Sequence, residues 1–95
     1  MSNFSPNGTG TGTVPVAGNP VQLPPTSCRR VTISASDLNS DLLAIGDQHV
    51  SASGRRGVLL QPGFSETFFV ASLNLLYIDA INSGDAFTYY WEIGS

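Results

Sequence analysis

Two stretches of this chain alternate apolar and polar side chains with a period of two, and this pattern limits the possible folds most. Residues 30–35 carry valine, isoleucine and alanine at every second position, and residues 86–92 place Phe87, Tyr89 and Trp91 in the same way. Because successive side chains of a β-strand point to opposite faces, each stretch is predicted to be a strand with one buried face. No window shows a convincing helical period, so the chain is predicted to be all-β.

Shorter strand candidates lie between these two stretches, and turn signals separate most of them. The signals combine glycine, proline, asparagine and aspartate at spacings near ten residues, as in Gly46-Asp47, Ser53-Gly54 and Pro62-Gly63. About seven short strands at this spacing predict a small β-sandwich or a jelly-roll-like barrel. The shorter candidates cover residues 42–45, 49–52, 57–60, 66–71 and 73–80.

The N-terminal part of the chain has a different composition. Residues 1–27 carry no charged side chain, hold five of the six prolines, and include a Gly/Thr tract at residues 8–13. Proline supplies no N–H and glycine raises the entropic cost of regular structure, so this segment cannot bury a core by itself. We therefore predict an extended N-terminal arm over residues 1–27 and a β-sandwich body over residues 28–95.

A body of this size is only marginally stable, because a domain of about 60 residues buries only about 60% of its unfolded surface. Cys28 is the only cysteine, so no disulfide can form within one chain. No Cys/His cluster suggests a zinc site. Self-association is therefore the predicted means of stabilisation.

Charge and hydropathy argue against nucleic-acid and membrane partners. The formal net charge is −3, lysine is absent, and the four arginines form two pairs rather than a basic stripe. The longest nearly apolar run, residues 68–78, is interrupted by Ser72 and Asn74 and is too short to span a bilayer. Residues 1–5 have no signal-peptide character. We expect a chain made in a cytoplasm.

The titratable residues do not form a recognisable catalytic group. His49 is the only histidine, and Asp47 is two residues away, but no nucleophile accompanies them. Cys28 is followed by Arg29 and Arg30, which supply charge but no base. Both residues are therefore expected to be structural, and the chain is not expected to be an enzyme.

Two acidic clusters, residues 37–41 and 79–85, could bind a hard cation such as Ca²⁺. Neither has the ligand spacing or the terminal glutamate of an EF-hand loop. Asx turns that close β-hairpins explain both clusters without a metal. No metal and no cofactor are predicted.

The C-terminal aromatic side chains have two interpretations. A small body needs large side chains in its core, so Phe87, Tyr89 and Trp91 are predicted to face inward. If that face were open to solvent, the rings could instead stack on sugars in a glycan-binding module. Tyr90 lies on the opposite face of the strand and is the expected exposed aromatic anchor.

The order of several motifs resembles that of small structural proteins of tailed-phage virions. In these proteins a strand begins near a cysteine, here Cys28, and an "IGD" turn follows, here residues 45–47. An "L-x-PG-x-S" turn and an "NL-x-x-I/V-x-A" strand come next, here residues 60–65 and 74–80. The resemblance covers roughly residues 21–92.

This resemblance implies a component of a phage particle, most plausibly a capsid decoration (cement) protein. Such a protein binds the major capsid protein and stabilises the shell in the virion, which is assembled in the bacterial host cytoplasm. By the same analogy it forms a homotrimer. Tail or fibre modules, including host or glycan recognition, are the alternative. The arm extends beyond the family's usual start, which implies an added contact with neighbouring subunits.

The arginine pairs are the clearest candidates for contact with another subunit. One pair opens a predicted strand and the other follows Ser53-Gly54 at a predicted loop tip. Arginine is enriched in protein interfaces because its planar guanidinium binds carboxylates bidentately, although surface arginines also serve solubility. The interface candidates are Arg55, Arg56, Arg29, Arg30, Tyr90, Val14 and Val16.

Overall fold

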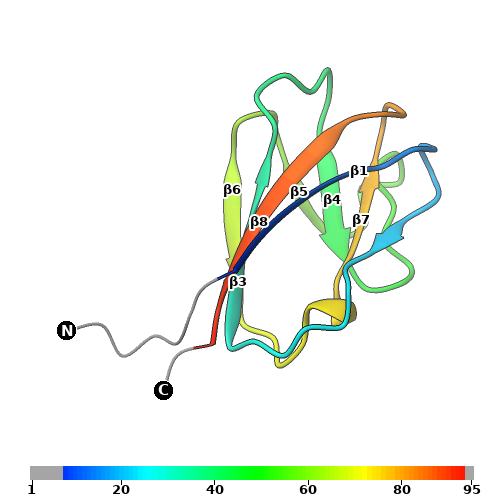
Figure 1. The fold of residues 1–95 in the computed structure, drawn as a ribbon. Helices are drawn as coiled ribbons and strands as arrows, with labels where there is room; N and C mark the ends of the chain where they lie inside the picture. Colours follow the sequence, from blue (N-terminus) through cyan, green and yellow to red (C-terminus); the bar gives the residue numbers. More distant parts are fainter. Residues whose placement is uncertain (1–7, 94–95) are drawn as a thin grey trace.

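The computed structural model describes residues 8–93, in which eight β-strands and one 3-10 helix follow one another (Figure 1). Residues 1–7 of the predicted arm and 94–95 of the predicted body lie outside the described residues. No described helix is long and apolar enough to cross a membrane. The elements are β1 (Gly8–Thr13), β2 (Val21–Gln22), β3 (Arg30–Ala35), β4 (Leu43–Gly46), β5 (Val58–Leu60), β6 (Ser65–Phe68), η1 (Leu73–Leu75), β7 (Tyr77–Ala80) and β8 (Ala86–Glu92).

The strands form two four-stranded antiparallel sheets. Sheet A has the order β1-β8-β3-β6, and sheet B has the order β2-β7-β4-β5. The pairs β1·β8, β2·β7, β3·β6 and β4·β5 nest within one another, so the chain is one long hairpin whose successive pairs alternate between the sheets. This is the strand order of an eight-stranded jelly roll, and it confirms the predicted all-β sandwich.

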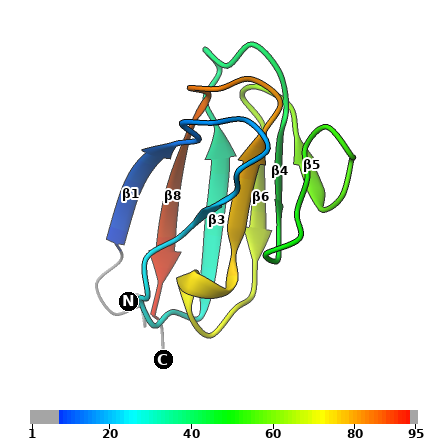
Figure 2. The same cartoon turned by 90° about the vertical axis from the view of Figure 1, so that its right-hand side faces the viewer.

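Part of the predicted arm lies within this sandwich. β1 is an edge strand of sheet A beside β8 (Figure 2). β2 is an edge strand of sheet B beside β7. The segment is extended, as predicted, but the boundary at residue 27 does not separate two structural units. Composition misleads here because a Gly/Thr strand buries little apolar side-chain surface of its own. It nevertheless forms a full hydrogen-bonded ladder with β8 and covers the side chains of that strand.

All five shorter predicted strands differ from the structure in their bounds, two of them by no more than a single residue at either end and three by more. Residues 49–52 lie in the β4–β5 connection and form a single bridge, between Ser51 and Arg56. β6 ends at Phe68, and residues 73–75 form η1 before β7 begins. The 49–52 segment alternates like a strand, but its apolar side chains Val50 and Ala52 cover sheet B instead of adding a strand to it.

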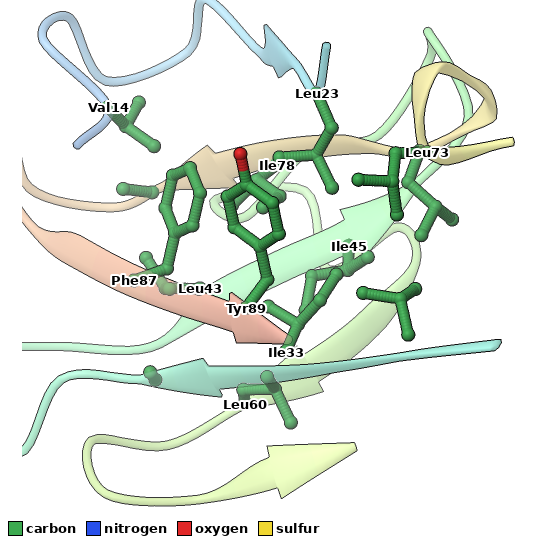
Figure 3. Close-up of a cluster of buried hydrophobic side chains, with 14 residues drawn as sticks. Val14, Leu23, Ile33, Leu43, Ile45, Leu60, Leu73, Ile78, Phe87 and Tyr89 are labelled. Atoms are coloured by element: carbon green, nitrogen blue, oxygen red, sulfur yellow. The ribbon is translucent and has the colours of Figure 1, made fainter. Parts of the chain in front are cut away.

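The main core fills the space between the two sheets. Phe87 and Tyr89 project from β8 into this cluster, as predicted (Figure 3). Trp91 is partly buried and packs against the cluster. Burying one large aliphatic or aromatic side chain contributes about 1.5–3 kcal/mol. The largest fully buried aliphatic side chains are Ile33, Leu43, Ile45, Leu73, Ile78, Val14 and Val31.

A second, smaller cluster lies on the outer face of sheet B. Ala44 of β4 is fully buried there, although the neighbouring side chains of β4 face the main core. Val50 and Ala52 of the β4–β5 connection, residues 47–57, cover this face and are buried against it. The connection therefore acts as a lid that closes the outer face of sheet B.

Candidate interaction site

The inner side of β1 is a row of glycines that lies against a row of aromatic rings. In the antiparallel register of β1 and β8, Gly8 pairs with Trp91, Gly10 with Tyr89, and Gly12 with Phe87. A Cβ atom built on these glycines would lie 2.0, 2.3 and 2.5 Å from the nearest ring atoms. Such distances are far below van der Waals contact. Only glycine fits at these three positions of β1.

The rings themselves form a continuous aromatic row, defined here as the side chains of Phe87, Tyr89 and Trp91. The ring centroids of Phe87 and Tyr89 are 6.1 Å apart, and those of Tyr89 and Trp91 are 5.8 Å apart with an interplanar angle of 26°. These values are within the range of favourable aromatic pairs. The Gly-x-Gly-x-Gly and aromatic-x-aromatic-x-aromatic periods match, which is the sequence signal that could have paired β1 with β8.

The opposite, outer face of sheet A is covered with hydroxyl groups and is called the hydroxyl face here. Two cross-strand hydroxyl pairs join β3 to β6, Thr32 with Thr67 and Ser34 with Ser65, both at 2.9 Å. The threonines of β1 and Thr88 of β8 are exposed on the same face. The hydroxyl face comprises Thr9, Thr11, Thr13, Thr88, Tyr90, Arg30, Glu92, Thr32, Ser34, Ser65 and Thr67.

Tyr90 is the exposed aromatic side chain of the hydroxyl face, as predicted, with 38% of its surface accessible. Thr9 and Thr32 are its cross-strand neighbours. Beside it, the Arg30 guanidinium donates two hydrogen bonds to the Glu92 carboxylate, one of them Nη2 to Oε2 at 3.1 Å. Tyr90 therefore stands in a polar surrounding of hydroxyls and an ion pair.

This ion pair shifts the titration of Glu92. The hydrogen bond from Arg30 lowers the pKa of the Glu92 carboxyl, partial burial opposes the shift, and a hydrogen bond with Tyr90 adds a smaller lowering effect. The same contact raises the pKa of Arg30. Arg30 is thus occupied within its own chain, which makes it a weaker candidate for contact with another subunit than a fully exposed arginine.

The other three arginines lie apart from this face. Arg55 and Arg56 are exposed on the β4–β5 connection, where Arg55 adopts the left-handed region with a φ of 58°. Arg29 is exposed directly before β3 begins, beside a shallow hollow that Phe69 also lines. The structure therefore does not bring the two arginine pairs together, because one lies on sheet B and the other on sheet A.

The two valines of the predicted arm have opposite environments. Val14 is fully buried in the main core, and its backbone exchanges hydrogen bonds with the Asp85 carbonyl and the Gly84 N–H. Val16 is 57% exposed. Val14 is thus a core residue of the folded chain, while Val16 remains accessible to a partner.

Asp79 and Asp85 of the second acidic cluster accept long-range hydrogen bonds rather than closing the predicted local Asx turns, whereas Asp41 of the first cluster accepts a local bond from the Leu42 N–H. Asp79 is buried and accepts hydrogen bonds from the backbone N–H groups of Gly18 and Ala52, both at 2.9 Å. Asp85 is also buried and accepts bonds at 3.4 Å from the backbone of Ser40 and Asp41. Across residues 8–93, no three metal-binding side chains lie together.

The two residues considered for catalysis lie on different parts of the molecule. His49 is exposed in the β4–β5 connection, where its backbone N–H donates to the Asp47 carboxylate. The Cys28 thiol donates to the Val70 carbonyl at 3.2 Å, and burial raises its pKa. A raised pKa disfavours the thiolate, so Cys28 behaves as a packed thiol.

Sequence reasoning missed the exposed apolar side chains at the two ends of the sandwich. Leu38 and Phe64, which are 90% and 60% exposed, lie in the β3–β4 and β5–β6 connections at one end. Phe69 is 76% exposed at the other end. Phe64 and Phe69 lie on either side of β6 in the chain. Their exposure could not be read from the sequence, because both directly flank the ladder of a short edge strand.

No family model, curated protein or solved structure gives a significant match to this chain.

Proposed function

We propose that this chain is a non-enzymatic structural protein of a bacteriophage virion, which self-associates and binds the capsid shell as a decoration protein does. The observation that carries this proposal is the eight-stranded jelly roll, an architecture that viral capsid domains and lectins share. The motif order over residues 21–92 adds the resemblance to phage proteins. The chain would be made in the bacterial host cytoplasm and would reside in the virion.

The β4–β5 connection is the surface that we assign to the capsid contact. It carries Arg55 and Arg56 side by side, both exposed, at the tip of the nested hairpin. Among residues 8–93 the structure records one ion pair, Arg30 with Glu92, which leaves these two guanidinium groups available to carboxylates of the major capsid protein. Desolvated arginines are frequent anchors of protein interfaces.

Co-sedimentation with undecorated phage heads tests this proposal. We expect saturable binding with a stoichiometry set by the shell symmetry, and a loss of affinity of about tenfold or more in the double variant Arg55→Ala/Arg56→Ala. Arg29→Ala is the matched control, because it removes an exposed guanidinium from the opposite sheet. Failure of the unaltered, folded protein to bind heads would exclude the decoration role.

Glycan recognition in a tail or fibre is the second candidate, and the exposure of Tyr90 favours it. An accessible ring among hydroxyls and a carboxylate–guanidinium pair offers both stacking and hydrogen bonding to a sugar. Binding on a glycan array that Tyr90→Ala abolishes and Thr88→Ala retains would support this function. An array without any signal would remove it.

A further inference from the structure

The aromatic row accepts only one kind of strand. Any strand that lies on these rings needs glycine at three alternating positions, since a Cβ atom at each position would overlap a ring. In the whole sequence, Gly8–Gly12 is the one segment with glycine at three alternating positions. The occupant of this row is therefore β1 of the same chain or β1 of another copy.

β1 is attached to the sandwich in a way that permits exchange. It is an edge strand that pairs with β8 alone, and its glycines contribute no side chain to the core. Val14 directly follows the C-terminal end of β1 and is buried in the main core. The next two residues, Pro15 and Val16, are exposed. From Ala17 on, the chain is bonded to the body again, through Ser83 and Asp79. The exchangeable unit thus comprises residues 8–14.

We propose that β1 is exchanged between copies, so that residues 8–14 of one copy lie on the aromatic row of the next. This proposal rests on the self-association in the proposed function and names its contact. The exchanged strand makes the same ladder and the same glycine–ring contacts as in the closed chain. Only the connection at Pro15–Val16 changes its path, and proline favours the extended path that reaches a neighbour.

The exchanged arrangement also gives the two valines distinct roles. Val14 inserts into the core of the neighbouring copy, and Val16 lies at the junction between the two bodies. Head-to-tail exchange of one strand per copy is a heterologous contact, which closes into a ring when the rotation between copies permits. A ring of copies has no loose strand, so every aromatic row stays covered.

Light scattering of the full-length protein provides the first test. We expect an oligomer whose mass is at least twice that of one chain, and a monomer for Gly10→Val, in which the new side chain overlaps Tyr89. Thr11→Val is the matched control, because it adds the same β-branched residue to the hydroxyl face of the same strand. Circular dichroism verifies that each variant is folded. A monomeric unaltered protein, or a folded Gly10→Val oligomer, contradicts the proposal.

A disulfide between β1 and β8 provides the second test and does not depend on Gly10. Thr11 and Thr88 are direct cross-strand partners, so Thr11→Cys/Thr88→Cys in a Cys28→Ser background places two sulfur atoms opposite each other. We expect covalent oligomers on a non-reducing denaturing gel, and none for either single-cysteine variant. A link formed only within one chain, or no link in an oligomer, overturns exchange. Neither test uses phage heads, so its failure is distinct from a failure of capsid binding.

Discussion

The two sheets are built from the same number of strands, yet their outer faces differ. In sheet B the β4–β5 connection folds over the outer face and buries Ala44, Val50 and Ala52 in a second cluster. In sheet A the outer face remains open and carries hydroxyl groups, one exposed tyrosine and one ion pair. Sheet B therefore supports the fold with both faces, whereas sheet A supports it with its inner face and leaves the outer face for solvent or a partner.

The largest expected effect comes from Asp79, which connects two loops on sheet B. Asp79→Ala would leave the backbone N–H groups of Gly18 and Ala52 without their acceptor, at a cost of roughly 3 kcal/mol or more in the free energy of unfolding. Asp79→Asn, which keeps one acceptor oxygen, should lose clearly less. Urea denaturation measures both values. Equal stability of Asp79→Ala and the unaltered protein would show that these two hydrogen bonds do not stabilise the fold.

The next effect concerns the inner face of sheet A. Gly10→Val should reduce the free energy of unfolding by about 2 kcal/mol or more, since the overlap with Tyr89 forces the ring or β1 to move. The Thr11→Val control should change stability by less than about 0.5 kcal/mol. Thermal denaturation of both variants checks this. If both lose the same stability, the glycine–ring fit is not what holds β1.

A smaller, pH-dependent effect is expected from the ion pair on the hydroxyl face. The pKa of Glu92 is lowered in the folded state from its ordinary value of 4.5, so its contribution to stability is present above that value and is lost as the pH falls through the lower, folded pKa. Glu92→Gln should therefore be less stable at neutral pH, and the difference should shrink in acid. Denaturation curves at about pH 7 and about pH 2 measure this change. A difference that grows in acid contradicts it.

The smallest effect is expected on the hydroxyl face itself. Ser34→Ala removes one exposed hydroxyl pair, with Ser65, and should change the free energy of unfolding by about 0.5 kcal/mol or less. The same measurement on Ala44→Ser, which adds one hydroxyl to the covered face of sheet B, should show a larger loss. A reversed order would mean that the two outer faces do not differ as described.

The period-two stretches predicted the all-β class, the buried faces of β3 and β8, and the exposure of Tyr90. The role of residues 8–13 could not be read from composition, because the segment gains its place from the rings that it covers. The lid over sheet B was also missed. Residues 49–52 alternate like a strand, and only the tertiary structure shows that Val50 and Ala52 cover a neighbouring sheet. The exposure of Phe69 could not be predicted either, because the direction of a side chain just beyond a ladder depends on how the chain continues.

The nested pairing of the strands also has a consequence for the order of folding. β1 and β8 are neighbours in sheet A although they lie at opposite ends of the described chain. During synthesis β1 is therefore present long before the aromatic row that it covers. Closing so long a loop costs entropy before any contact is gained, and folds with many distant contacts fold slowly. We expect sheet A to be completed only after β8 has left the ribosome, and in a cell full of nascent copies the first β8 that β1 encounters need not be its own.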